Sequence, residues 1–372
     1  MKSCSGIIIT PQNYEAYGGL TKTRPDYMIP FAGRYRLIDF ALSSMSNFSL
    51  YRVMLYAGDN VRSTLDHIGD GKSWELNRRN NGLFINPSSY DSLTHTKSEI
   101  QTYFDSISYY ENSPAQHIHI INPMTIAKPN LDDAYAEFTD HDYDVMLFYK
   151  NVKDNEGNYN GMRKIIFDDN GDLINVGINL STCPEFPLYI DRMFIKKKVF
   201  IELVKNSIEM GNARTLIQAI SNHRSVLHIG AYEIKNHIEV IHSIESYYQA
   251  SMNLLNQDNY NELFFADGLV YTKSKDEPST LYYESAKVQN SLIANGCIIE
   301  GQVENSILFR GVHIKKNAIV RNCVLNEKTV VEENAVVANV ITDKNVCIMN
   351  SVAIAGAYTH PYMIEKNETV TR

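Results

Sequence analysis

The chain has 372 residues, of which 44% are hydrophobic and 21% are charged, ordinary proportions for a soluble globular protein. This length accommodates about two domains, each with its own core. The 43 acidic and 35 basic residues give a formal net charge of -8. This charge argues against nucleic acid or an anionic membrane as a partner, because such partners usually require a basic face.

The N-terminus leads directly into an apolar run and lacks a secretory leader, and no apolar stretch is long enough to span a bilayer. The five cysteines (Cys4, Cys183, Cys297, Cys323 and Cys347) are scattered and form no C-x-x-C pair. This pattern predicts free, mostly buried thiols in a reducing compartment, and therefore a cytoplasmic protein.

The first predicted strand covers residues 6–9 and is followed by a loop where nucleotide-binding proteins often cradle phosphates. Such loops are rich in glycine, because backbone N–H groups must approach the anion closely. Here Pro11 removes a donor, Tyr14 adds bulk and Glu15 adds a negative charge, while Gly18 and Gly19 come late. The loop has the position for nucleotide binding but the wrong chemistry.

The first two thirds of the chain alternate predicted strands with predicted helices. The strands are expected at 52–57, 117–121, 144–149 and 163–167, and the helices at 35–45 and 247–256. This alternation predicts an α/β fold with a mixed sheet and flanking helices. Because His117 and His119 alternate with isoleucines, we expect both to face solvent.

The last ninety residues have a different pattern. From residue 288 onward, pairs of β-branched residues recur every five to seven positions between Asn, Gly and charged residues. This spacing predicts a left-handed parallel β-helix of hexapeptide repeats, whereas a β-sandwich of short strands has a spacing of about 8–12 residues. We therefore expect an α/β domain at 1–256, a linker at 257–286 and a β-helix at 287–372.

Two long stretches resemble a known family. The segments 20–43 and 295–312, which include Ile29-Pro30-Phe31-Ala32-Gly33-Arg34-Tyr35-Arg36 and Asn295-Gly296-Cys297-Ile298-Ile299-Glu300-Gly301, are similar to bacterial ADP-glucose pyrophosphorylase, or glucose-1-phosphate adenylyltransferase. The resemblance covers nearly the whole chain. It implies a nucleotidyltransferase (Rossmann-like) domain followed by a β-helix.

The family's catalytic residues are missing from the matching positions. Its signature G-G-x-G-T-R-L falls on residues 11–17, its R-A-K-P on 24–27, and its glucose-phosphate motif E-K-P is not recognisable at 175–180. The two aspartates that bind metal fall on Met124 and Val240, and a thioether is a poor ligand for Mg²⁺. The replaced positions are Pro11, Gln12, Tyr14, Ala16, Asp26, Met124 and Val240.

Adenylyl transfer depends on metal and cationic groups that stabilise charge at phosphorus. The resemblance therefore implies a regulatory, non-catalytic subunit that modulates a catalytic homologue in glycogen synthesis. We expect no cofactor in this chain and Mg²⁺ in the catalytic partner. The family's tetramers imply a heterotetramer, although self-association is also open.

Four cations are candidate ligands for a sugar-phosphate effector. Arg24 and Arg36 match activator-binding positions of the family, Lys22 lies one place from a family lysine, and Arg34 completes the cluster. Arginine binds phosphate through two parallel hydrogen bonds. A solvated basic rim is the other interpretation.

Nearby polar residues have structural interpretations. Asp39, on an otherwise apolar helix face, is expected to form an internal hydrogen bond or salt bridge. The segment 66–74 has one His, two acids and the only Trp. An ordered loop packed by Trp74 is favoured there over a metal site.

Two other functions stay open. A divergent but active nucleotidyltransferase would use Glu239 together with Lys22 and Arg24, although Glu239 is adjacent to Val240 and faces the other way on a strand. A hexapeptide-repeat acyltransferase would need a catalytic histidine, for which His313 is the candidate within the repeats.

Overall fold

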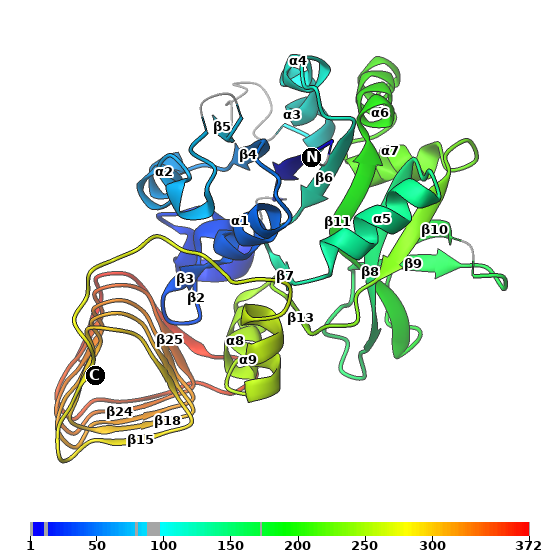
Figure 1. Cartoon of the computed structure of the whole chain (residues 1–372). Coiled ribbons are helices and arrows are strands. Elements are labelled where there is room, and N and C mark those ends of the chain that lie inside the picture. Colours follow the sequence, from blue (N-terminus) through cyan, green and yellow to red (C-terminus); the bar gives the residue numbers. More distant parts are fainter. Residues whose placement is uncertain (1–2, 11–13, 79–80, 88–96, 172, 372) are drawn as a thin grey trace. The chain divides into compact units, whose positions relative to one another are not determined.

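The computed structural model describes residues 3–10, 14–78, 81–87, 97–171 and 173–371 (Figure 1). The chain forms two compact units. The first contains residues 1–11, 44–57 and 75–236, and the second contains 12–43, 58–74 and 237–372. The predicted boundaries after residues 256 and 286 stay predictions, and this division assigns 12–43 and 58–74 to the unit that holds the C-terminal segment.

The first unit is built on a nine-stranded mixed sheet with the order β10-β9-β11-β6-β1-β4-β5, in which β8 pairs with β11 and β12. Strand β1 runs parallel to β4 and β6, whereas β11 runs antiparallel to β6. The strands are β1 (Cys4–Ile8), β4 (Val53–Ala57), β5 (Leu83–Pro87), β6 (His117–Ile121), β8 (Val145–Lys153), β9 (Arg163–Phe167), β10 (Leu173–Ile178), β11 (Glu185–Lys196) and β12 (Ile229–Glu233). The short β7 (Thr125–Ala127) also belongs to this unit. The predicted α/β mixed sheet is confirmed.

Helices of the first unit cover the sheet through apolar side chains. They are α3 (Glu99–Asp105), α4 (Ile107–Glu111), α5 (Leu131–Asp140), α6 (Lys197–Met210) and α7 (Leu216–Asn222). Thr215 and Gln218 form a capping box that begins α7. Ile7, Tyr103 and Phe200 belong to one buried cluster, which joins the sheet to α3 and α6.

The prediction that His117 and His119 face solvent is wrong. His119 is fully buried, its Nδ1 lies 3.1 Å from the Met193 carbonyl oxygen, and its ring packs 4.3 Å from that of Phe194. His117 is half-buried, and its Nδ1 lies 2.7 Å from the Tyr135 hydroxyl. Strand β6 is central in the sheet, where both faces are covered, so alternation does not indicate a solvent side.

The second unit contains short elements as well as the repeats. They are η1 (Tyr14–Thr21), η2 (Asp26–Met28), β2 (Pro30–Phe31), β3 (Tyr35–Arg36), α2 (Val61–Ile68), η3 (Lys72–Trp74), β13 (Ile238–Val240), α8 (Ile244–Asn253) and α9 (Gln257–Phe264). Helix α1 (Leu37–Asn47) begins in this unit and ends in the first. The predicted linker at 257–286 contains α9 and the first strand of the β-helix.

Two predicted helices begin at other residues in the structure. The helix expected at 35–45 begins at Leu37, because Tyr35 and Arg36 pair with Pro30 and Phe31 as a hairpin. The helix expected at 247–256 begins at Ile244, because Ser243 caps it by accepting from the Ser246 N–H.

The C-terminal segment is a parallel β-helix, which Figure 1 shows as stacked triangular coils. Successive coils pair in register, as in Val303↔Val320 and Val320↔Val337, and their inward side chains form one buried core. One face contains β14 (Leu281–Tyr282), β17 (Ile298–Ile299), β20 (His313–Ile314), β23 (Val330–Val331), β26 (Cys347–Ile348) and β29 (Thr369–Val370). The second contains β15 (Lys287–Gln289), β18 (Gln302–Glu304), β21 (Ile319–Arg321), β24 (Val336–Ala338) and β27 (Ala353–Ala355). The third contains β16 (Leu292–Ile293), β19 (Ile307–Leu308), β22 (Val324–Leu325), β25 (Val340–Thr342) and β28 (Tyr362–Ile364). The β-sandwich alternative is wrong, because all these pairs are parallel.

Asparagines stabilise the corners between the coils. Asn305, Asn322 and Asn339 have positive φ angles of 46°, 49° and 52°, which Asn tolerates better than most residues. The Nδ2 of Asn322 donates to the Asn339 side chain of the next coil at 3.2 Å. These corners explain the recurrent Asn in the repeat.

The structure places most of the cysteines in the interior as free thiols, as their scattered positions in the sequence predict. The cysteines at 4, 297 and 323 are buried, Cys347 is half-buried, Cys183 is exposed, and all five are free thiols. Within the described residues, no helix is both long and apolar enough to cross a membrane.

Candidate functional site

The β2–β3 hairpin of the second unit presents two of the predicted effector-binding cations. Its turn has Ala32 and Gly33 at φ angles of 52° and 78°, so that Tyr35 returns beside Phe31. Arg34 is exposed at the end of the turn, and its guanidinium lies over the Tyr35 ring at 5.0 Å. Arg36 is half-buried and donates to the Met28 carbonyl at 2.7 Å.

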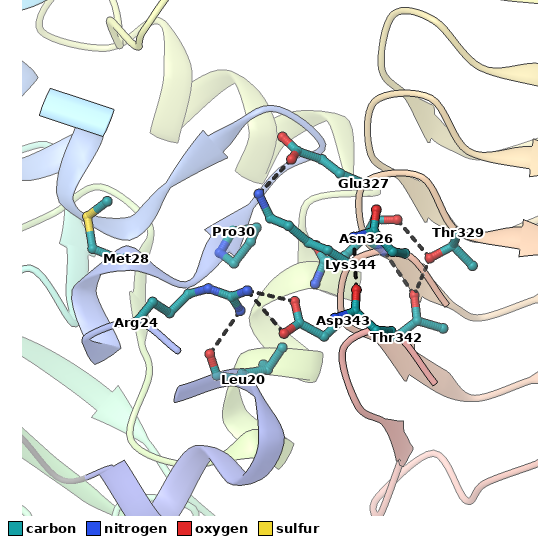
Figure 2. Close-up of polar contacts among 12 residues, drawn as sticks. Leu20, Arg24, Met28, Pro30, Asn326, Glu327, Thr329, Thr342, Asp343 and Lys344 are labelled. Carbon is teal, nitrogen blue, oxygen red and sulfur yellow. Dashed lines mark hydrogen bonds and ion pairs between the residues drawn. The ribbon is translucent and has the colours of Figure 1, made fainter. Parts of the chain in front are cut away.

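The other two predicted cations lie elsewhere and are already paired. Arg24 is 3% exposed, and its Nη2 donates to both oxygens of Asp343 at 2.9 and 3.0 Å (Figure 2). Its Nη1 donates to the Leu20 carbonyl at 2.9 Å. Lys22 is exposed and contacts Glu365 at 2.5 Å. The charge of Arg24 is therefore neutralised by a buried, bidentate ion pair.

A small, open hollow lies beside the hairpin, and cations from four parts of the sequence line it. The hairpin contributes Arg34 and Arg36, the extended segment before the β-helix contributes two lysines, and β-helix corners contribute the rest. The charged and titratable lining residues are Arg34, Arg36, His67, Lys273, Lys275, Arg310, Glu327 and Lys344. Six cations and one carboxylate make this hollow, here called the basic pocket, a candidate anion site.

The crowding of positive charge in the basic pocket perturbs its titratable groups. Burial lowers the pKa of Arg36, and the neighbouring Arg24 charge lowers it further. Burial and the Arg36 charge lower the pKa of Lys344 to about 8. Burial would raise the pKa of Glu327, but Lys344 and Lys275 outweigh this effect and lower it to about 2. The cations therefore repel one another, and an added anion would relieve that repulsion.

Asp39 has the internal role that its place on the helix predicts. Its Oδ2 accepts from the Arg36 N–H at 3.0 Å, and its Oδ1 lies 2.7 Å from His67 Nε2. These bonds hold α1, α2 and the hairpin strand together at the wall of the basic pocket. The segment 66–74 is packed by the fully buried Trp74, as predicted. Among the described residues, no group of three or more His, Cys, Asp and Glu side chains is arranged to bind a metal.

The positions where the resemblance places the family's metal ligands do not fit a hard cation. Met124 is 3% exposed and follows β6 in the first unit. Val240 is 7% exposed and ends β13 in the second unit. Neither side chain offers an oxygen, which Mg²⁺ requires. Glu239 is buried and already contacts His237 Nε2 at 2.7 Å and Asn253 Nδ2 at 2.9 Å.

The remaining replaced positions fall within residues 11–26. Pro11 and Gln12 lie outside the described residues. Tyr14 begins η1, and Ala16 is half-buried within it. Asp26 is fully buried at the start of η2, where its Oδ1 accepts from the Tyr27 N–H at 2.8 Å. The family motif E-K-P would fall near Asn179, which is buried and donates to the Tyr159 carbonyl.

An internal polar cluster lies at one end of the sheet in the first unit. Asp191 has a φ of 49° at a bulge in β11, and it contacts Arg163 Nη1 and Asn122 Nδ2, both at 3.3 Å. Glu99 lies close by, and burial raises its pKa to about 7 despite the Arg163 charge. Arg163 is therefore engaged by this chain's own acids.

Sequence reasoning missed four cations of the basic pocket: Lys273, Lys275, Arg310 and Lys344. They lie more than 230 residues beyond the hairpin, so no local motif connects them to Arg34 and Arg36. The sequence contains part of the information needed to find this pocket, because Arg310, Glu327 and Lys344 are spaced 17 residues apart. In-register coils of a β-helix bring such positions together.

Comparison with known proteins agrees with this architecture. Residues 279–359 match the family described as GlmU-like, C-terminal hexapeptide. The chain is 33% identical to the glycogen biosynthesis protein GlgD of Bacillus subtilis over 84% of this chain and 80% of the relative. It belongs to the GlgD family.

GlgD relatives and catalytic enzymes are both similar to the chain. GlgD of Geobacillus stearothermophilus is 32% identical over 85% of this chain and 82% of the relative. Glucose-1-phosphate adenylyltransferase of Clostridium perfringens (strain 13 / Type A) is 27% identical over 88% of this chain and 84% of the relative. The GlgD family is thus related to ADP-glucose pyrophosphorylase, as the resemblance implied.

Proposed function

We propose that this GlgD-family chain is a regulatory, non-catalytic subunit that modulates a catalytic glucose-1-phosphate adenylyltransferase in cytoplasmic glycogen synthesis. That enzyme converts ATP and glucose 1-phosphate to ADP-glucose and diphosphate. The observation that carries the proposal is the chemistry at two positions. Met124 and Val240 are buried apolar side chains where metal-binding aspartates are expected.

The loss extends beyond the metal site. The phosphate-binding loop lacks its glycines, and Asp26 is a buried acid where the family pattern has lysine. Each change removes a group that would stabilise negative charge at the transferring phosphorus. Together they support binding and regulation by this chain rather than chemistry.

We further propose that the basic pocket binds a phosphorylated effector. Arg34 and Arg36 are the cations at the pocket that the sequence analysis assigned to this role. Lys22 and Arg24 support the same region indirectly, because their ion pairs join η1 and the following turn to the β-helix.

The purified chain should be assayed alone and then mixed with a catalytic homologue, with ATP, glucose 1-phosphate and Mg²⁺. We expect no turnover by the chain alone, and in the mixture a changed response to a sugar-phosphate activator and a heterotetramer by size measurement. Robust turnover by the chain alone would overturn the proposal. So would kinetics and particle size that stay the same in the mixture.

A divergent active enzyme is the second candidate function, but the surroundings of Glu239 give little support to a catalytic role for that residue. Its carboxylate is bound to His237 and Asn253. Loss of a weak metal-dependent turnover in Glu239→Ala would favour that function.

The acyltransferase alternative depends on His313, whose Nε2 lies 2.8 Å from Glu300. Binding of acetyl-CoA by calorimetry would favour it, and we expect none.

A further inference from the structure

Three charged residues of the basic pocket form a column that the β-helix repeat creates. The strands β19, β22 and β25 pair in register through Leu308↔Leu325 and Leu325↔Thr342. Two residues beyond these positions come Arg310, Glu327 and Lys344. Neighbouring strands lie about 4.8 Å apart, so the column places an acid directly between two cations.

The carboxylate of Glu327 binds cations on three sides. Its Oε2 accepts from Lys344 Nζ at 2.6 Å, as Figure 2 shows. Its Oε1 accepts from Lys275 Nζ at 3.0 Å and lies 3.7 Å from Arg310 Nη1. The side chain is 18% exposed, so these contacts are only partly screened by water.

Three positive groups around two carboxylate oxygens is the arrangement that a phosphoryl group would need. Lys275, Arg310 and Lys344 each place a side-chain nitrogen within 3.7 Å of the Glu327 carboxylate. The arginine can offer parallel hydrogen bonds, and the lysines are compact point charges. Glu327 supplies one negative charge there, whereas a phosphoryl group would supply about two.

We propose that Glu327 is an internal counter-anion that occupies the phosphoryl subsite of the basic pocket and sets its affinity by competition. This inference rests on the proposed effector function. A ligand phosphoryl group and the tethered carboxylate compete for the same donors of Lys275, Arg310 and Lys344. The free chain is thereby protected from cation repulsion, and only an anion of higher charge displaces the carboxylate.

The test is calorimetric titration of the full chain with inorganic phosphate and, separately, with glucose 6-phosphate. We expect Glu327→Gln to bind both about tenfold more tightly than the unmodified chain, a difference of about 1.4 kcal/mol. The matched control is Glu332→Gln. Glu332 forms a similar half-buried pair with Lys315 at 2.7 Å in the β-helix but does not line the basic pocket. We expect that variant to bind as the unmodified chain does.

Unchanged or weaker binding by Glu327→Gln would overturn the inference, because Glu327 would then only hold the cations in place. A gain confined to glucose 6-phosphate would also overturn it, since the sugar would then make the new contact. If Glu327→Gln does not fold, Glu327→Asp replaces it: the shorter carboxylate reaches fewer donors, so affinity should rise by a smaller factor, and no rise overturns the inference.

Absence of binding to both the unmodified chain and Glu327→Gln would overturn this inference together with the effector role of the basic pocket. The subunit function would be unaffected by that result, because it is tested by activity in the mixture.

Discussion

Arg24 and Lys344 are both cations of the second unit, but their surroundings give them different roles. Arg24 is buried against Asp343 and the Leu20 carbonyl, so its charge is used inside the protein. Lys344 lines the basic pocket among other cations, and its ammonium group pairs with Glu327. Resemblance to activator-binding positions indicated Arg24 but could not show that the fold had paired it.

The Arg24–Asp343 pair is expected to be structural. Replacing Arg24 by Met leaves the buried carboxylate of Asp343 without its partner, which should lower the free energy of unfolding by about 3–5 kcal/mol. Urea unfolding of the purified chain measures the change. Lys22→Met is the matched control, because its pair with Glu365 is exposed, and surface pairs contribute about 0–1 kcal/mol. Equal stability of the two variants would contradict the structural role.

Lys344 is expected to make anion binding depend on pH. Burial and Arg36 lower its pKa to about 8 in the folded chain, whereas its ordinary value is 10.5. Between these values the unfolded chain binds more protons, so this group makes stability rise with pH, and its cost to folding is largest below about pH 8. An anion that pairs with charged Lys344 should therefore stabilise the chain more at pH 7 than at pH 9.5.

Sulfate is the suitable probe, because its own charge is constant over this range. The measurement is the increase in melting temperature caused by sulfate at the two pH values. In Lys344→Met the increase should be smaller and should no longer fall between pH 7 and pH 9.5. A fall of the same size in both proteins would show that another group is responsible.

At the scale of elements, the β-helix shows how a short repeat determines which side chains are inside. Val336 and Val337 are neighbours in β24, yet Val336 is 40% exposed and Val337 is fully buried. Each strand of the β-helix pairs only with the equivalent strands of the neighbouring coils. Buried positions can thus be read from the five-to-seven-residue period.

This difference gives a matched pair of variants. Val337→Ala removes two buried methyl groups from the core and should cost about 2 kcal/mol of unfolding free energy. Val336→Ala removes the same atoms from a half-exposed position and should cost well under half as much. Chemical denaturation of the two variants makes the comparison, and equal losses would mean that the register of β24 is not the one described.

Periodicity was less informative for the central sheet. The alternation of His117 and His119 with isoleucines suggested a solvent-facing side, but β6 lies between β1 and β11 in the interior. Strand pairing also determined where one helix begins. Tyr35 and Arg36 pair with Pro30 and Phe31, so the helix predicted from residue 35 begins at Leu37. Pairing of this kind depends on backbone contacts that local spacing does not encode.

At the scale of the whole molecule, catalytic function depends on several groups acting together. The proposed inactivity concerns the metal positions, the phosphate-binding loop and Asp26. We therefore expect the double variant Met124→Asp, Val240→Asp to stay without turnover, because the loop would still lack its glycines and arginine. The assay measures diphosphate release with ATP, glucose 1-phosphate and Mg²⁺.

A catalytic glucose-1-phosphate adenylyltransferase is the positive control for this assay. Circular dichroism should show that the double variant still folds, since two carboxylates at buried positions also cost stability. Measurable turnover by the double variant would mean that the other replaced positions are compatible with catalysis, and it would favour the divergent-enzyme function.

By itself, the sequence determined the α/β class and the β-helix, because these depend on residue type and on short periods. It also named Arg34 and Arg36 as candidate binding cations, and both line the basic pocket. Only the tertiary structure decided that Arg24 is neutralised by Asp343, and that Lys273, Lys275, Arg310 and Lys344 complete the pocket. The physical reason is that charge compensation depends on distance in space, and Arg24 and Asp343 lie 319 residues apart along the chain.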